Sequence, residues 1–449
     1  MRFPEKFPKS KAIADRMQCF FESSKLERVA IATKFVQKES PMTGAKFAQI
    51  CIGGITEQGL MGTLGELCTL GQKLGVELCE QSLNERFNAK AVAYVQQLFE
   101  KALYLRFDPS VLQVLESFSQ IKVEDSTVIK LPPHLEELFS GSGGDASKAA
   151  LKIDYTYNVK AAEFVLHLRS GKQPDSSMSL GEVLTPKSLW LRDLGYFGID
   201  DFEKMDLAKA CYISRLRSDV NVYLSEDEEA TPVDLAKLIK KLKENQVLDL
   251  PVFIGKTKRL PTRLILQRLP QQVAAHNRRK VARDRRRKGS KTSKTRLDFC
   301  DFNAFITNLE AVQWPPHLVM QLYKIRWQIE ILFKVWKSIL KIGQVQRMKA
   351  HRFLCLLYAQ LLWAVLNMSI FQAFKNHFWN AFGVELSELK GYKLLRSFHK
   401  ELIMALWKNQ KQLYEQCLQD MYRALARFGK KQCRKNNPNP LFICEKSLT

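Results

Sequence analysis

Residues 322–340, LYKIRWQIEILFKVWKSIL, place one carboxylate among several cations at a helical spacing. On a helix that turns about 100° per residue, five polar side chains share one narrow stripe: Tyr323, Arg326, Glu330, Lys334 and Lys337. The apolar residues of the stretch fall on the opposite arc and are expected to pack in a core. Such a stripe is typical of a solvated, salt-bridged helix face. The density of cations around Glu330 favours a second interpretation, in which this carboxylate holds a metal ion and its neighbours bind phosphodiester oxygens.

Two aspartates lie in or at the end of strand-like runs that would belong to an α/β sheet. Asp125 lies in a strand-like run over residues 121–129, and Asp193 ends a second run that begins at residue 189. The separations along the chain are 193 − 125 = 68 and, to Glu330, 330 − 193 = 137. Hard divalent cations prefer carboxylate oxygens as ligands.

Other acids compete for the same role. Glu124 adjoins Asp125 but points to the opposite face of a strand, because successive side chains alternate. Asp154, on the presumed neighbouring strand, is an alternative to Asp125. Asp200 and Asp201 follow the next strand and are expected to begin a helix, where acidic side chains interact favourably with the helix dipole.

A second candidate site is the basic segment over residues 277–296, NRRKVARDRRRKGSKTSKTR. Eleven of its twenty residues are Lys or Arg, including Arg285, Arg286 and Arg287. Asp284 is the one acidic residue among them. Contacts between such cations and phosphates release counterions and so drive binding. The segment therefore predicts contact with a nucleic-acid backbone, and a nuclear-localisation signal is the alternative.

The whole chain has the same charge bias. Its 449 residues include 70 Lys and Arg against 46 Asp and Glu, a formal net charge of +24. This surplus favours a nucleic-acid partner over the alternative of a basic protein of another kind, such as a ribosome-associated factor. The ten cysteines include no Cys-x-x-Cys pair and no zinc-finger spacing, which indicates reduced thiols in a cytosolic compartment.

One segment, residues 353–374, is long and apolar enough to suggest a membrane span. Gln360, Asn367 and Gln372 interrupt it, and cations lie on both sides. The expectation is therefore a buried helix of a large core, with no membrane involved. The first residues, MRFPEK, show no apolar signal core.

The elements that must position these groups fall into three parts. Residues 1–115 have the pattern of amphipathic helices and suit a DNA-binding or a dimerisation domain equally well. Residues 116–350 form an α/β part with the order three strands, a helix, a strand, a helix and a strand. Within it, residues 217–303 are interpreted as a strand-containing insertion. Residues 351–449 are expected to be helical.

The spacing of Tyr323, Arg326, Glu330 and Lys337 is Y-x2-R-x3-E-x6-K, and here the chain resembles the DDE transposases of the insertion-sequence-four type. Asp125, in the run EDST, resembles the first catalytic aspartate of that family. Asp193, in the run RDLGYF, resembles the second. The resemblance spans about residues 120–350. It implies a ribonuclease-H-like mixed sheet with flanking helices, a strand-containing insertion, and helical N- and C-terminal regions.

The resemblance also implies an activity. It is metal-dependent cleavage and strand transfer at the terminal inverted repeats of an insertion sequence, by cut-and-paste DNA transposition. The implied cofactor is two Mg²⁺ ions, or Mn²⁺ as a substitute, bound by Asp125, Asp193 and Glu330. The residues expected to contact DNA are Tyr323, Arg326, Lys334, Lys337, Arg285, Arg286 and Arg287.

The expected partners are double-stranded DNA, as transposon ends and as target, and a second copy of the chain in a homodimer on DNA. The expected location is the prokaryotic cytoplasm, in association with the nucleoid. Two other functions remain as alternatives. One is a stand-alone nuclease of the ribonuclease-H type, and the other is a catalytically dead DNA-binding protein of transposase descent.

Overall fold

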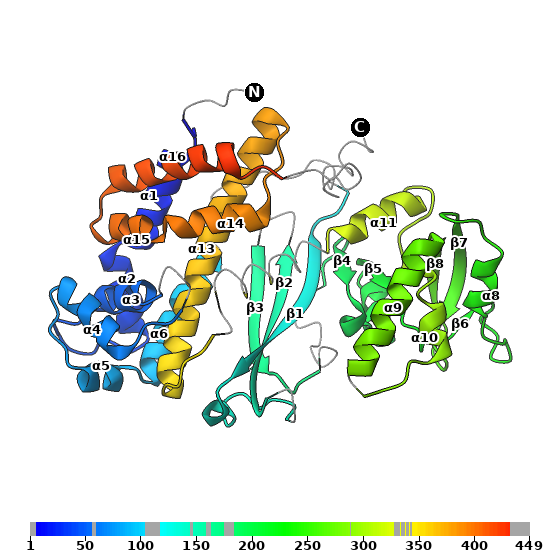
Figure 1. Ribbon diagram of the computed structural model, residues 1–449, viewed down its shortest axis with the longest axis horizontal. Helices are drawn as coiled ribbons and strands as arrows, with labels where there is room; N and C mark the ends of the chain where they lie inside the picture. Colours follow the sequence, from blue (N-terminus) through cyan, green and yellow to red (C-terminus); the bar gives the residue numbers. More distant parts are fainter. Residues whose placement is uncertain are drawn as a thin grey trace.

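Two sets of helices, drawn from opposite ends of the chain, form one helical body (Figure 1). The computed structural model describes residues 6–55, 60–103, 117–143, 147–158, 163–174, 184–287, 289–326, 333, 337, 341 and 344–431. The first set is α1 (Ser10–Phe20), α2 (Ser23–Ala32), α3 (Gly44–Gly53), α4 (Leu64–Lys73), α5 (Glu80–Arg86) and α6 (Ala89–Leu103). The second set is α13 (Ala350–Phe382), α14 (Glu388–Ser397), α15 (His399–Trp407) and α16 (Lys411–Phe428). Both sets contribute to a single apolar core.

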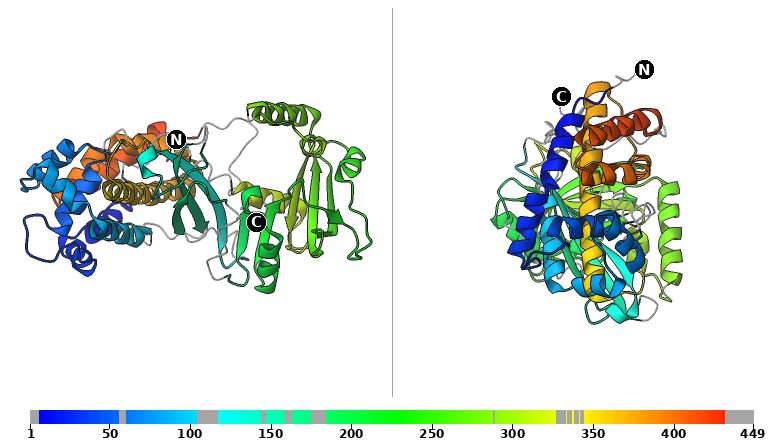
Figure 2. Two further views of the ribbon diagram at one scale, coloured as in Figure 1. Left: turned by 90° about the horizontal axis from the view of Figure 1, so that it is seen from below. Right: turned by 90° about the vertical axis from the view of Figure 1, so that its left-hand side faces the viewer.

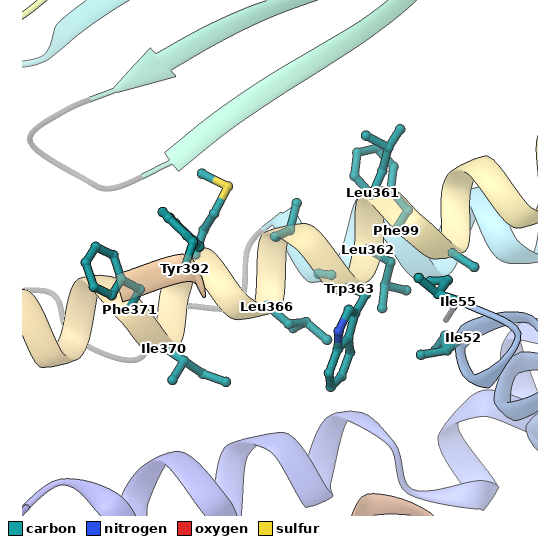
Figure 3. Close-up of a cluster of buried hydrophobic side chains, with 14 of the residues drawn as sticks. Ile52, Ile55, Phe99, Leu361, Leu362, Trp363, Leu366, Ile370, Phe371 and Tyr392 are labelled. Carbon is teal, nitrogen blue, oxygen red and sulfur yellow. The ribbon is translucent and has the colours of Figure 1, made fainter. Parts of the chain in front are cut away.

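Helix α13 is the central element of this body. It lies against α6 and α3, while α1 lies against α16. Figure 3 shows Leu362 and Trp363 of α13 beside Ile52 of α3 and Phe99 of α6. Each fully buried side chain of this kind contributes about 1.5–3 kcal/mol to folding. The two ends of the chain are therefore held together mainly by apolar contacts.

The two sets approach closely enough at one point to require glycine. A Cβ atom on Gly53, the last residue of α3, would lie 1.9 Å from the ring of Trp407 at the end of α15. No side chain fits at that distance, so glycine at this position lets α3 reach the second set.

Among the described residues, one helix, α13, has the length and apolar composition of a membrane span. Of its most apolar stretch, 78% is buried inside the protein. Gln360 and Asn367 are buried as well, and the Asn367 side chain donates a hydrogen bond to the carbonyl of Trp363 at 2.8 Å. This burial agrees with the core helix predicted from the polar interruptions.

The middle of the chain forms a mixed sheet, which has nine strands in the described part of the structure. Their order is β3-β2-β1-β4-β5-β9-β8-β7-β6. The strands are β1 (Ile121–Leu131), β2 (Ala149–Asn158), β3 (Glu163–Ser170), β4 (Leu189–Arg192), β5 (Cys211–Arg215), β6 (Val222–Tyr223), β7 (Val247–Ile254), β8 (Leu260–Arg268) and β9 (Phe302–Thr307). Strands β1, β4 and β5 are mutually parallel, and the remaining neighbours pair antiparallel.

Apolar side chains cover both faces of the sheet. One face, with Val123 and Leu191, joins the core of the helical body and packs on α11 (Pro316–Lys324). The other, with Trp190 and Tyr212, packs on α7 (Ile199–Leu207) and forms a separate core. The helix expected between the third and fourth strands would fall on residues 171–188. Residues 175–183 lie outside the described part, and the described residues on either side of them are not helical.

The predicted insertion contributes strands to the same sheet. It holds β6, β7 and β8, together with α8 (Leu235–Lys240), α9 (Gln271–Arg287) and α10 (Lys294–Asp298). Strand β8 pairs with β9, and β9 pairs with β5, so the insertion lengthens the sheet beyond β5. Two side chains fasten β9 to β5. The Thr307 hydroxyl donates to the carbonyl of Tyr212 at 2.6 Å, and the Asn308 side chain accepts from the Tyr212 N–H at 2.9 Å.

The helix expected to run unbroken through residues 322–340 is interrupted. Helix α11 ends at Lys324, and Ile325 and Arg326 form a turn before Phe333 and Lys337, which are helical again. At this end the N–H groups of Ile325 and Arg326 bond three residues back, at 3.0 and 3.1 Å, which tightens the last turn. A uniform helical wheel over the whole stretch is therefore wrong at this point.

Candidate active site

The parallel pairing of β1 with β4 brings Asp125 and Asp193 together. The register pairs Ile121 with Leu189 and Val123 with Leu191, a constant offset of 191 − 123 = 68. Asp125 and Asp193 have the same offset, 193 − 125 = 68: Asp125 lies two positions past Val123 in β1, and Asp193 lies two positions past Leu191, directly after the last residue of β4. Because side chains alternate along a strand, the two carboxylates lie level and on one face, where β4 ends.

Arg326 connects the two carboxylates. Its Nη1 lies 3.7 Å from Oδ2 of Asp125, and its Nη2 lies 4.0 Å from Oδ1 of Asp193. The Arg326 side chain is 5% exposed, against 18% for Asp125 and 37% for Asp193. A single buried guanidinium therefore offsets the repulsion of two carboxylates that stay open to solvent.

Tyr323 is buried behind this group. Its hydroxyl donates to the carbonyl oxygen of Arg192, the residue before Asp193, at 3.3 Å. The centre of the Arg326 guanidinium lies 5.6 Å from the centre of the Tyr323 ring. Burial raises the pKa of the Tyr323 phenol, which keeps it a neutral donor. Tyr323 and Arg326 thus do not form the solvated helix face that the amphipathic pattern alone would suggest.

Lys337 is close enough to Asp125 for the two charges to interact. Its side chain is exposed, yet neighbouring protein atoms remove enough hydration to lower the pKa of Lys337, and the charge of Asp125 acts in the opposite direction. Phe333 packs edge-on against Tyr155, with ring centres 5.9 Å apart. Tyr155 is the residue of β2 that pairs with Asp125, so an aromatic wall flanks the carboxylate.

The donor set suits a hard divalent cation. Asp125 and Asp193 offer carboxylate oxygens from adjacent strands, and both already face a common cation. Glu330 and Lys334 lie outside the described residues. Within the described part of the chain, no three His, Cys, Asp or Glu side chains gather as a metal site.

The competing acids have structural partners. Asp154 is fully buried, forms an ion pair with Arg169 and accepts a hydrogen bond from the Tyr196 hydroxyl at 3.3 Å. Its partner on β1 is Ser126, so it lies on the face opposite Asp125. Asp200 and Asp201 lie in the first turn of α7, as predicted.

Glu124 also points away from the site, as predicted, and it forms an ion pair with Arg192 at 2.7 Å. Arg192 was not singled out from the sequence. The signal that would have identified it is again the strand offset, 192 − 124 = 68, which sets Arg192 level with Glu124.

The arginine-rich segment forms α9 and the turn after it. In Figure 1 and in the left view of Figure 2, α9 lies in the part of the molecule away from the helical body. Ala274 is buried, whereas the cations that follow are largely exposed: Arg278, Arg279, Lys280, Arg283, Arg286, Lys291, Lys294 and Arg296. Arg278 forms an ion pair with Asp301. Arg285 is half-buried, and the side chain of Arg287 lies outside the described part.

Comparison with known proteins agrees with this geometry. A family model described as "Transposase DDE domain" matches residues 116–366. The transposase for insertion sequence element IS231C of Bacillus thuringiensis subsp. berliner is 29% identical over 94% of this chain and 94% of its own length. The transposase for insertion sequence element IS1151 of Clostridium perfringens is 28% identical over 97% of this chain and 96% of its own length.

The structure predicts opposite phenotypes for two neighbouring aspartates. Asp154→Asn should lower the free energy of unfolding, towards the lower end of the about 3–5 kcal/mol typical of a broken buried ion pair, because Arg169 keeps some access to water. It should leave Mn²⁺ uptake unchanged. Asp125→Asn should lose Mn²⁺ uptake and remain stably folded. Urea unfolding and calorimetric Mn²⁺ titration measure both properties, and loss of Mn²⁺ binding in stable Asp154→Asn protein would move the site to the opposite face.

Proposed function

Because this chain belongs to the family of transposases with a DDE domain, we propose that Asp125, Asp193 and Glu330 are its three catalytic carboxylates. Enzymes of this family cut and rejoin DNA strands in a reaction that depends on divalent metal. The observation that carries the proposal is the convergence of Asp125 and Asp193 on Arg326, at the level where β4 ends. Glu330 is assigned on its place in the signature that contains Arg326.

The cofactor proposed is a pair of Mg²⁺ ions, which Mn²⁺ can replace, held by the oxygens of these three residues. Bound there, the ions supply activation of the attacking oxygen and charge stabilisation of the leaving one. Asp125 and Asp193 present their oxygens from two paired strands, so their spacing is fixed before DNA arrives. Such rigidity favours an in-line reaction, because the reacting atoms must be held in place.

The cations around the carboxylates are proposed to hold the scissile phosphate. Arg326 spans both aspartates with one planar group and can donate to phosphate oxygens as well. Lys337, and with it Lys334, would neutralise the backbone on the open side of Asp125. The Tyr323 hydroxyl already donates to the carbonyl oxygen of Arg192, so its contribution would be to hold the backbone there.

The remaining parts of the chain are assigned by their charge and packing. Residues 116–350 are proposed as the catalytic domain with residues 217–303 as its insertion, and the exposed cations of α9, with Arg285, Arg286 and Arg287, as a second DNA-binding surface. Residues 1–115 and 351–449 would bind DNA or form the dimer through the helical body. The substrate proposed is the pair of terminal inverted repeats, brought together by a homodimer on DNA within the bacterial nucleoid.

The first test addresses the three carboxylates. Asp125→Asn, Asp193→Asn and Glu330→Gln should each abolish strand cleavage and leave binding to the element ends largely intact, since most affinity comes from cations elsewhere. Cleavage of end-containing DNA and gel-shift affinity measure the two properties. Full Mg²⁺-dependent cleavage by one variant would remove that residue from the site. Absence of cleavage in the wild-type protein would indicate the inactive descendant.

The second test addresses the arginine-rich segment. Replacing Arg285, Arg286 and Arg287 by Gln should weaken binding to all DNA sequences alike. It should also flatten the slope of log affinity against log salt by roughly 0.9 per lost phosphate contact. The matched control replaces Lys240, Lys241 and Lys243, exposed lysines elsewhere in the insertion, so that both variants carry 24 − 3 = +21. Equal slopes for the two variants would mean that the segment makes no phosphate contacts of its own.

The third test addresses the cations at the site. Arg326→Ala and Lys337→Ala should each lower cleavage and strand transfer by about 10²-fold, as for loss of one donor to a transition state, and should lower general DNA affinity much less. The carboxylates remain, so Mn²⁺ uptake should persist. Lys324→Ala is the control, because Lys324 is exposed at the end of α11, two residues before Arg326. A double variant of Arg326 and Lys337 that cleaves at the wild-type rate would reduce both residues to structural roles.

A further inference from the structure

A buried ion-pair network lies directly behind the two aspartates. Glu124 and Arg192 precede Asp125 and Asp193 by one residue each, so they lie level with one another on the opposite face of the sheet. Arg192 Nε lies 2.7 Å from Oε2 of Glu124. The Arg192 side chain is 1% exposed and that of Glu124 is 4% exposed.

Arg192 is held by further partners. Its Nη1 lies 2.8 Å from Oδ2 of Asp201, in the first turn of α7. Its guanidinium lies 5.9 Å from the centre of the Tyr196 ring. Its carbonyl oxygen accepts the hydrogen bond from Tyr323. The side chain of Arg192 thus joins β1, β4 and α7, while its main chain contacts the helix that precedes Arg326.

This network does not touch the reacting groups, yet two of its members, Glu124 and Arg192, are each one peptide bond from a proposed metal ligand. A buried charge that loses its partner must move or draw in water, because an uncompensated ion in the interior is costly. Movement of Arg192 shifts the backbone of Asp193, and movement of Glu124 shifts that of Asp125. The spacing of the two carboxylates therefore depends on the ion pairs behind them.

We propose that Glu124, Arg192 and Asp201 are positioning residues that fix the separation and direction of the Asp125 and Asp193 carboxylates for divalent-metal binding. The inference rests on the proposed function, since it takes these two aspartates as metal ligands. Groups that orient metal ligands from behind typically change metal affinity or activity by about 10- to 100-fold when they are replaced.

The test measures Mn²⁺ affinity of the full-length protein by titration calorimetry, together with thermal stability. Glu124→Gln should bind Mn²⁺ about 10- to 100-fold more weakly than wild type. The matched control is Glu388→Gln, which removes the same charge from a partly buried pair in the helical body, where Glu388 lies 2.5 Å from Lys375. The control should lose thermal stability as Glu124→Gln does, but keep wild-type Mn²⁺ affinity.

If Glu124→Gln does not fold, Asp201→Asn is the milder variant. The Asp201 side chain is 20% exposed, and its substitution leaves the Glu124–Arg192 pair in place. It should weaken Mn²⁺ binding in the same direction by a smaller factor. Wild-type Mn²⁺ affinity in folded Glu124→Gln or Asp201→Asn protein would overturn the inference, as would an equal loss of affinity in Glu388→Gln. Asp193→Asn separates this failure from that of the proposed function. If Asp193→Asn retains Mn²⁺ binding, the metal site itself is misassigned; if it loses binding while Glu124→Gln keeps it, only the positioning role fails.

Discussion

The parallel hydrogen bonding of β1 with β4 is the constraint on which the site depends. Its single register forms one cross-strand pair at each residue, and successive pairs lie on alternate faces of the sheet. It sets the Lys122 ammonium 4.8 Å from the centre of the Trp190 ring on one face, and then Glu124 beside Arg192. On the other face it sets Val123 beside Leu191, and then the two aspartates. A slip by one residue would turn every side chain of one strand to the other face, exchanging a carboxylate that must meet solvent for one that must be buried.

Much of this arrangement follows from local sequence patterns. The strands that carry Asp125 and Asp193, and the direction of Glu124 away from Asp125, follow from two-residue alternation and from short apolar runs. The family membership was predicted from the spacing around Glu330, and the comparisons confirm it. The long-range features were less accessible. Arg192 gains its role largely through Glu124, a partner on another strand and far away along the chain, and no local pattern identifies that partner.

The end of α11 at Lys324 is the clearest failure of local reasoning. A helical wheel assumes that the backbone continues unchanged, and the residues from 322 onward have good helical periodicity. The turn at Ile325 and Arg326 accompanies the burial of Arg326 between two carboxylates and against Tyr323. The two carboxylates come from β1 and from the end of β4, so tertiary contacts accompany the departure from the helix at Ile325 and Arg326. The insertion gives a similar lesson, because its strands were recognisable but their continuation of the central sheet was not.

The joining of both chain ends in one helical body bears on how the protein is made. Helices α1 to α6 leave the ribosome first and end at Leu103, but α13, which covers their apolar faces, begins only at Ala350. At about 5–20 residues per second, synthesis of the chain between them takes roughly 12 to 50 seconds. During that time the early helices have only one another for cover, and exposed apolar surface invites aggregation and proteolysis. A truncation that removes α13 and the helices after it therefore leaves the early helices without the partners that complete their core. Such a shortened chain is expected to be degraded, and not to act as a smaller enzyme.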